Sequence, residues 1–389
     1  MSGIRVQVEP EVLQWVMQTA IQQNAENETI DKIEHWIAGD ITPTFHQLEE
    51  LARKTNIPVG YFFLKKPPVE SCRIVDFRTV DSISVVNPSR NLLDTVDAMS
   101  RAQEWMSEYK KNSGAEPCPY VGCIKISDGC AAAAKRIRSE LGLDIQWFAE
   151  FRNAIAAFRE LRKRIAALGI LVMMNGVVGN NTHRKLSTNE FRAFTLIDQY
   201  APLIFINTTD SENGKLFSLL HELVHVMLGK ASFYNDEYGS LTYSNKEEQF
   251  CNAVAADLLV PEEIFITEWK QHHGTTAEIV EALEQLFVCS AFVLLRKALD
   301  CSLIATEEYN RYVKLYEKRY QDHRDGMPAN SGGNYYNTMK SRWDPNFVQA
   351  LGSSVASGRT QYREAYYLTN TTGKTFAALA ETTGEYDIG

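Results

Sequence analysis

Two histidines spaced four residues apart are the strongest chemical signal in the sequence. They belong to the segment HELVH, as His221 and His225. In a helix, side chains at i and i+4 lie one above the other on one face, so both imidazoles can reach a single metal ion. Glu222 follows the first histidine, where a general base could take a proton from a water molecule at the metal. The pattern therefore predicts a mononuclear zinc peptidase site, although three matching positions also occur by chance on ordinary helices.

The residues around this motif indicate that its helix is buried. The segment KLFSLLHELVHVMLG, residues 215–229, is apolar on nearly all sides, and such a helix belongs in a protein interior. Burying two histidines and a carboxylate without partners costs several kcal/mol. A bound metal ion would satisfy them.

A second helix offers a third ligand. The segment EQFCNAVAADLLVP begins at Glu248 and places Asn252 one turn later. A glutamate from a following helix is a normal zinc ligand and leaves the fourth position open for water. Glu247 is the competing candidate, but Glu248 shares a small-residue face with Asn252 and Ala255. Asn252 could support the site by a hydrogen bond to an imidazole or to Glu248, or it could be a surface amide.

The stretch LSTNEFRAFTLIDQYAPLIFINTTDSENGKLFSLLHELVHVMLG, followed by EEQFCNAVAADLLVP, resembles the ImmA/IrrE family of bacterial and phage metallopeptidases. The similarity covers about residues 165–265. It implies a zincin-like domain of the gluzincin type, with zinc held by His221, His225 and Glu248. It also implies that Glu222 is the general base. This sequence has Cys251 and Val254 where the family usually has alanine and phenylalanine.

Substrate-binding residues are less well defined. PLIFIN, residues 202–207, could be an edge strand that pairs with an extended substrate, with Leu203 and Phe205 in contact with it. It could equally be a core strand. An oxyanion needs a hydrogen-bond donor, for which the candidates are Tyr234, Tyr238, Tyr243 and Arg192.

The apolar patterns and the helix-ending residues predict a mostly helical α+β fold. Helices are expected at 9–23, 29–37, 44–54, 90–109, 146–169, 215–229, 248–260, 345–357 and 359–368, and strands at 170–175, 192–198 and 202–207. The polar, glycine-rich segment 321–334 is a linker candidate. The predicted parts are a helical module at 1–66, a linker and helical region at 67–140, the peptidase domain at 141–320, and a small helical module at 335–389 with a mobile tail.

Residues 28–63 resemble the later helices of a Cro/XRE-type helix-turn-helix. The resemblance implies a DNA-binding ancestry, but the chain before IEHWIAG is short for a complete motif. Residues 1–67 also hold six Lys/Arg against nine Asp/Glu, whereas DNA binding draws on basic contacts to phosphates. Protein docking or autoregulation is the favoured role, and DNA binding the lesser alternative.

The overall composition sets the class of protein. The chain has 389 residues, 44% of them hydrophobic, and a net charge of −9. This composition suits a globular protein and gives no general reason to expect a nucleic-acid partner. No apolar run approaches the roughly 20 residues of a membrane helix, and the first residues lack the apolar core of a signal peptide. The seven cysteines contain no CxxC pair, which favours reduced thiols in the cytoplasm.

Three functions fit these features. The first is a zinc endopeptidase that cleaves a specific protein, such as a transcriptional repressor, in a phage or mobile-element, toxin–antitoxin or stress-response circuit. The second is a transcription regulator or antitoxin-like binding protein without proteolysis. The third is a protease toxin restrained by a cognate antitoxin. Three protein ligands with an open position favour catalysis, since structural zinc sites usually have four protein ligands.

Overall fold

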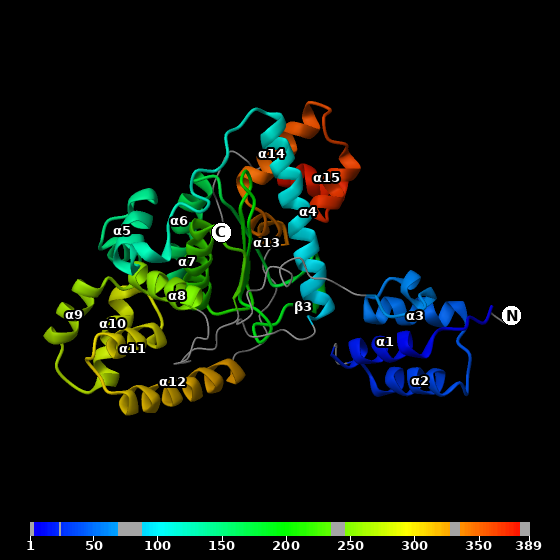
Figure 1. Ribbon diagram of the computed structural model, residues 1–389, viewed down its shortest axis with the longest axis horizontal. Coiled ribbons are helices and arrows are strands. Elements are labelled where there is room, and N and C mark those ends of the chain that lie inside the picture. The colour runs from blue at the N-terminus through cyan, green and yellow to red at the C-terminus, as the bar shows by residue number, and fades with distance from the viewer. Residues whose placement is uncertain (1–3, 23–24, 69–87, 235–245, 327–334, 382–389) are drawn as a thin grey trace. The chain divides into compact units, whose positions relative to one another are not determined.

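The computed structural model describes residues 4–22, 25–68, 88–234, 246–326 and 335–381 (Figure 1). The described residues up to 68, together with 88–96, form one compact unit, and those from 97 to 381 form another. We call these unit 1 and unit 2.

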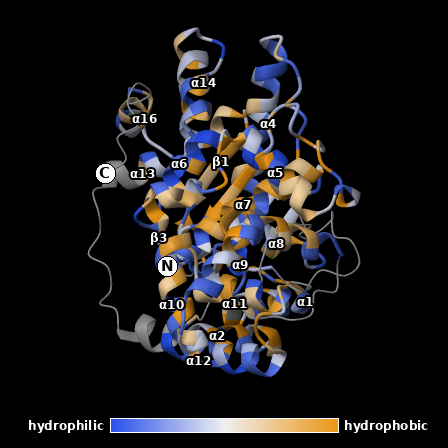
Figure 2. Cartoon of the chain, turned by 90° about the vertical axis from the view of Figure 1, so that its left-hand side faces the viewer, coloured by the Kyte–Doolittle hydropathy of each residue, from blue (hydrophilic) through white to orange (hydrophobic). Residues whose placement is uncertain are grey.

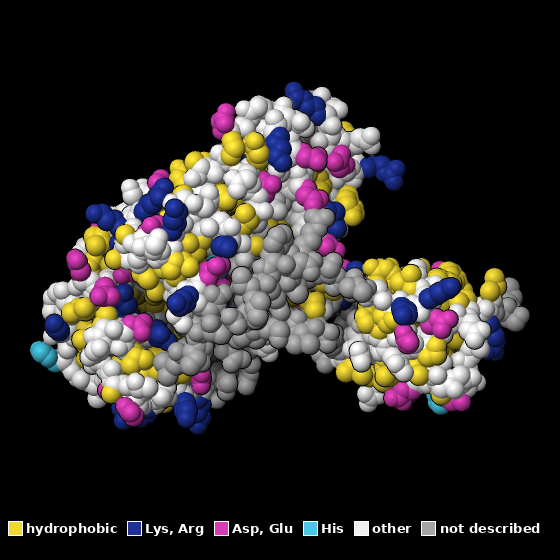
Figure 3. All heavy atoms as spheres, viewed as in Figure 1, with side chains coloured by type: hydrophobic (Ala, Val, Ile, Leu, Met, Phe, Trp, Pro, Cys, Tyr) yellow, Lys and Arg dark blue, Asp and Glu magenta, His cyan; other side chains and the backbone are white. Residues whose placement is uncertain are grey.

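Unit 1 is a small helical bundle. Its elements are α1 (Pro10–Gln22), α2 (Asn27–Ala38), α3 (Phe45–Thr55) and the 3-10 helix η1 (Val59–Phe63). Helix α3 begins at a capping box in which Thr44 and Gln47 bond each other's backbone N–H groups. Val16, Ile33 and Phe62 are fully buried in the core between these elements. Acidic, basic and hydrophobic side chains are interspersed over the face of this unit seen in Figure 3.

The centre of unit 2 is a four-stranded mixed sheet. Its strands are β1 (Leu171–Asn175), β5 (Leu203–Asn207), β4 (Ala193–Leu196) and β6 (Ser232–Tyr234), in that spatial order. β1 and β5 are parallel, whereas β4 is antiparallel to both β5 and β6. A separate hairpin contains β2 (Val177–Val178) and β3 (Asn181–Lys185). Every residue of β4 and β5 is buried, as expected for strands covered on both faces.

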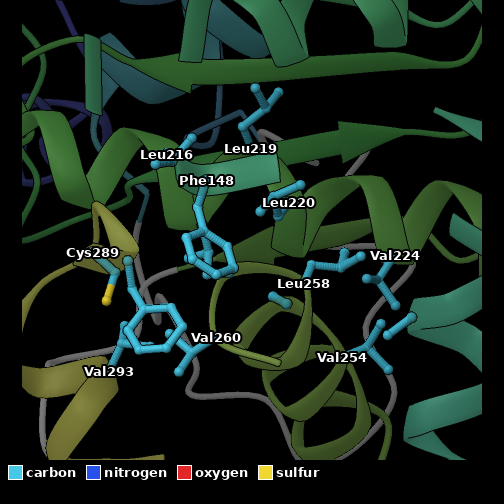
Figure 4. Packing of buried hydrophobic residues seen from close by; sticks show 14 of the residues in the cluster. Phe148, Leu216, Leu219, Leu220, Val224, Val254, Leu258, Val260, Cys289 and Val293 are labelled. Carbon is cyan, nitrogen blue, oxygen red and sulfur yellow. The ribbon is translucent and has the colours of Figure 1, made fainter. Parts of the chain in front are cut away.

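Hydrophobic residues gather at the centre of this sheet (Figure 2). The helices α6 (Ala154–Ala167) and α7 (Glu212–Leu228) pack against it. The other helices up to residue 326 are α4 (Arg90–Asn112), which begins in unit 1, α5 (Cys130–Glu140), α8 (Lys246–Leu259), α9 (Glu262–Gln271), α10 (Thr276–Phe287), α11 (Ala291–Asp300) and α12 (Thr306–Gly326). Short 3-10 helices lie at η3 (Ile126–Asp128) and η4 (Trp147–Glu150). Phe148 of η4 packs among Leu220 of α7, Leu258 of α8 and Val293 of α11 (Figure 4). One core thus joins the helices that carry the candidate site to the helices that follow them.

The last described helices are attached to the outer edge of β1. They are α13 (Tyr335–Arg342), α14 (Pro345–Ala356), α15 (Tyr362–Thr369) and α16 (Gly373–Ala380). The Asp344 carboxylate accepts a 3.0 Å hydrogen bond from the backbone N–H of Val172 in β1. Arg162 donates to the backbone oxygens of Val172 and Trp343, at 2.9 Å each. Side chains, rather than another strand, therefore satisfy Val172 at this edge.

Two sequence-based expectations need correction, and one element was missed. The expected helix 146–169 is divided, because Asn153 caps a new helix by accepting a 2.9 Å hydrogen bond from the Ala156 N–H. Helix α12 extends to Gly326 and so enters the segment expected to be a linker. The β2–β3 hairpin was not predicted, because Asn181–Lys185 is polar and mostly exposed. Within the described residues, no helix is long and apolar enough to cross a membrane.

Candidate metal centre

Helix α7 carries the HELVH residues and holds them in the interior. It begins at Ser211, whose side chain accepts a hydrogen bond from the Gly214 N–H, and ends at Gly229 in the left-handed conformation. Its apolar faces pack against the sheet, α6 and α8. His221, Glu222 and His225 are all 0% exposed, as the apolar surroundings in the sequence predicted.

The two histidines and Glu248 form a cluster that could hold a metal ion. The Nε2 atoms of His221 and His225 lie 3.1 Å apart. Glu248 places Oε2 3.2 Å from Nε2 of His221 and Oε1 3.4 Å from Nε2 of His225. Ligands about 2.0–2.1 Å from a tetrahedral zinc ion lie about 3.3 Å from one another. The spacing of these three side chains therefore fits zinc.

Helix α8 brings Glu248 to the histidines because its facing residues are small. Cys251 and Ala255 are fully buried, and small side chains let two helices approach closely. Burial alone would raise the pKa of Glu248, but hydrogen bonds with His221 and His225 outweigh it and hold that pKa well below its usual range. Glu248 is thus ionised, as a metal ligand must be.

The neighbouring Glu247 occupies a different position. Its Oε1 atom lies 3.8 Å from Nδ1 of His225, on the ring nitrogen that does not face His221. It is not part of the cluster. Of the two candidates that the sequence offered, the geometry favours Glu248 as the third ligand.

Cys251 is a buried thiol beside the cluster. Burial raises its pKa to about 11, although the neighbouring His225 opposes the shift. Its sulfur is not part of the cluster that could hold a metal ion, and its side chain is fully buried. The cysteine that departs from the family pattern therefore acts as a small apolar side chain in the packing of α8.

Glu222 directly follows His221 in α7, and its carboxylate is held by the sheet. Thr195 of β4 and Ser232 of β6 each donate a hydrogen bond to Oε2 of Glu222. Its other oxygen, Oε1, is buried and has no hydrogen-bond partner among the described residues. One side of the carboxylate is thus fixed, and the other remains available to accept a proton.

Thr195 and Ser232 were not singled out from the sequence. A signal for Thr195 exists, because it is a polar residue inside the otherwise apolar strand AFTL. Such a buried hydroxyl needs a partner, which the strand alone does not reveal. Ser232 carries no comparable signal, since serine is common in short connections between elements.

Asn252 is buried on α8, but neither its amide oxygen nor its amide nitrogen has a hydrogen-bond partner among the described residues. The same holds for the Nδ1 atoms of His221 and His225. The supporting role of Asn252 therefore stays a prediction.

The candidates for oxyanion donor divide into three groups. The ring of Tyr234 lies 4.1 Å from the ring of His221, centroid to centroid, and so belongs to the site. Arg192 uses one guanidinium nitrogen to bond both oxygens of Asp210, at 2.7 Å each, which ties β4 to the start of α7. Tyr238 and Tyr243 lie outside the described residues.

The expectation that PLIFIN is an edge strand is wrong. Strand β5 lies between β1 and β4, and both of its edges are paired. Leu203 and Phe205 are buried in the core. They cannot pair with a substrate there, and the core-strand alternative describes them correctly. The edge of the sheet near His221 is β6 instead.

Two family models match parts of the chain. Residues 165–298 match a peptidase family model described as the IrrE N-terminal-like domain. This IrrE-like region contains all the residues of the metal cluster, together with Thr195, Glu222 and Ser232. Residues 343–382 match a second family model, described as a domain of unknown function. No curated protein and no solved structure matches the chain. The family match supports a metallopeptidase of the ImmA/IrrE type.

Proposed function

We propose that this protein is a zinc-dependent endopeptidase with a zincin-like catalytic domain. His221, His225 and Glu248 would hold the zinc ion, with the fourth position open. The observation that carries the proposal is the state of Glu222. This buried carboxylate belongs to the residue that follows His221, and it has one oxygen bonded and the other without a partner among the described residues. A metal site built only for stability needs no such group.

The residues of this chain would divide the reaction between them. Zinc, when bound, would polarise the peptide carbonyl and make water a better nucleophile. Glu222 would accept the proton of the attacking water and deliver it to the leaving amine. Tyr234, whose ring is tilted against the ring of His221, is the best-placed described candidate to donate a hydrogen bond to the oxyanion.

Strand β6 is the best candidate for holding the substrate. It ends the sheet, and among the described residues no strand pairs with its outer edge. An extended peptide could add to this edge through backbone hydrogen bonds. This arrangement would bring the scissile bond near the residues that β6 and α7 contribute.

We propose a specific protein as the substrate, such as a transcriptional repressor, and a cytoplasmic location for the reaction. The seven cysteines without a CxxC pair support that location. Proteolysis also distinguishes this proposal from a regulator that acts by binding alone. Such a regulator would not need Glu222 as a general base. A protease toxin with a cognate antitoxin shares the same chemistry and differs only in the partner.

Co-expression with proteins encoded by neighbouring genes tests the proposal. The intact protein should cleave one of them, and Glu222→Gln should bind the same protein without cleaving it, because the change removes the base and keeps the size of the side chain. Cleavage would be detected by mass spectrometry of the fragments. Identical behaviour of the two proteins would instead support the binding function.

A further inference from the structure

Thr195 and Ser232 face the same carboxylate because of their register in the sheet. They are directly opposite each other in the antiparallel β4–β6 pair. Opposite residues of such a pair point to the same side of the sheet, which here is the side of α7. Both are buried, Thr195 completely. Two strands distant in sequence thus present a pair of hydroxyl groups to Glu222.

These hydroxyls make the two oxygens of Glu222 unequal. Each hydroxyl has one proton to donate. Thr195 Oγ1 lies 2.5 Å from Oε2 of Glu222 and 3.4 Å from its backbone oxygen, so the proton points to the carboxylate. Ser232 donates to the same Oε2 atom. Oε1 accepts no hydrogen bond from the described residues.

We propose that Thr195 and Ser232 are positioning residues that fix the Glu222 carboxylate and direct proton transfer to Oε1. This inference rests on the proposed peptidase function. The proton of the attacking water would go to Oε1 and from there to the leaving amine nitrogen as the C–N bond breaks. Oε2 would keep its hydrogen bonds from the two hydroxyls throughout. Without the pair, the side chain could rotate away from the reacting atoms.

Five variants separate this role from simple packing. Thr195→Val and Ser232→Ala each remove one hydroxyl, and they are made singly and together. Thr195→Ser keeps a hydroxyl at position 195. Ser218→Ala is the matched control, because Ser218 is a buried serine on α7 whose hydroxyl has no hydrogen-bond partner among the described residues. Circular dichroism and thermal melting would first establish that each variant is folded.

The first readout is cleavage of internally quenched peptides by the zinc-loaded protein. Removing both hydroxyls should lower kcat by about 10- to 100-fold, the range usual for residues that orient a catalytic group, and leave KM nearly unchanged. Thr195→Ser and Ser218→Ala should retain the wild-type kcat. In a Glu222→Gln background, the double change should cause no further loss, because the hydroxyls act only through Glu222.

The second readout needs no substrate. Acetohydroxamic acid gives up its hydroxyl proton when it binds a metal, and Glu222 would be the acceptor. Calorimetry should show weaker binding to the double variant and to Glu222→Gln, but not to Ser218→Ala. Zinc affinity, measured by competition with a chelator, should be equal in all of them, since neither hydroxyl contacts the metal cluster.

The possible results have different meanings. If the double variant keeps the wild-type kcat and hydroxamate affinity, the positioning role is wrong and the proposed peptidase function still stands. If it loses zinc affinity as well, the hydroxyls support the metal cluster instead, and the inference is also overturned. If Glu222→Gln itself equals the wild type in both readouts, the proposed function fails.

Discussion

The carboxylate of Glu248 lies 3.2 Å from Nε2 of His221, although the two residues belong to different helices. The adjacent Glu247 points instead toward the opposite ring nitrogen of His225, at 3.8 Å. Two neighbouring glutamates of the same charge and size thus reach different nitrogens, Glu248 the Nε2 atoms of both histidines and Glu247 only Nδ1 of His225. They form a natural pair of test and control.

Replacing Glu248 should abolish tight zinc binding. Glu248→Gln removes a charged ligand, and we expect zinc affinity to fall by more than about 100-fold. Even mutation of a residue that only hydrogen-bonds to a metal ligand typically lowers metal affinity by about 10- to 100-fold. Glu247→Gln should change it by less than about 10-fold. Competition with a chromophoric chelator would measure both. Equal losses in the two variants would contradict the assignment of Glu248.

Zinc should stabilise unit 2. A ligand that binds only the folded state adds about 2.7 kcal/mol at a concentration 100 times its Kd. Differential scanning fluorimetry should show a higher Tm with zinc and a return to the lower Tm when a chelator is added. His225→Gln should show almost no zinc-dependent change. A shift of the same size in this variant would place the zinc elsewhere.

Gly229 should be intolerant of any side chain. It ends α7 with a φ of +69°, and a Cβ atom there would lie 3.2 Å from Cα of Gly122. Left-handed backbone alone costs a non-glycine residue about 1–2 kcal/mol. Gly114 has a φ of +71°, but a Cβ atom added there would meet no other atom within 4 Å. Gly114→Ala therefore measures the cost of the left-handed backbone alone.

We expect Gly229→Ala to lower the free energy of unfolding by more than Gly114→Ala does, because the 122–124 loop also bonds to the end of α7. Gly122 donates to the Val226 oxygen at 3.3 Å, and Ile124 donates to the Met227 oxygen at 3.0 Å. Urea denaturation would measure both variants. Equal losses would show that the loop moves aside without cost.

Asp257 of α8 should be essential for stability. Its carboxylate lies 3.4 Å from Arg138 of α5 and 3.2 Å from Lys297 of α11, and all three side chains are nearly buried. Asp257→Asn would leave two buried cations without their shared counter-charge, a change that typically costs about 3–5 kcal/mol.

Glu262 is the matched control for Asp257. It also lies 3.2 Å from Lys297, but its side chain is 60% exposed. Glu262→Gln should therefore cost less than about 1 kcal/mol. Chemical denaturation of the two variants would compare them. A large loss in Glu262→Gln would show that the exposed pair, rather than the buried one, holds Lys297.

The residues near one another in sequence were predictable, whereas those joined only by the sheet were not. His221, Glu222 and His225 lie within two turns of one helix, so their spacing reveals their common face. Thr195 and Ser232 are neighbours only because β4 and β6 pair in this register. That register depends on the path of the chain between the two strands.

The position of the PLIFIN strand could not be predicted for the same reason. PLIFIN is an apolar run, and such a run fits an inner strand as well as an edge strand. Only the positions of β1 and β4 decide between them. Helix α8 shows the opposite case, because the sequence predicted a helix that starts near Glu248 and stops at Pro261, and the structure has a helix at Lys246–Leu259.

The hydrogen bonds of Asp344 and Arg162 to β1 also bear on self-association of this protein. An edge strand with free N–H and C=O groups can template pairing with another chain, which leads to aggregation. Here the Asp344 carboxylate and the Arg162 guanidinium occupy both backbone groups of Val172. A chain that lost residues 335–381 would expose a hydrophobic strand, and would be prone to self-association even with its metal cluster intact. We therefore expect the C-terminal helices to limit self-association of the domain that they follow.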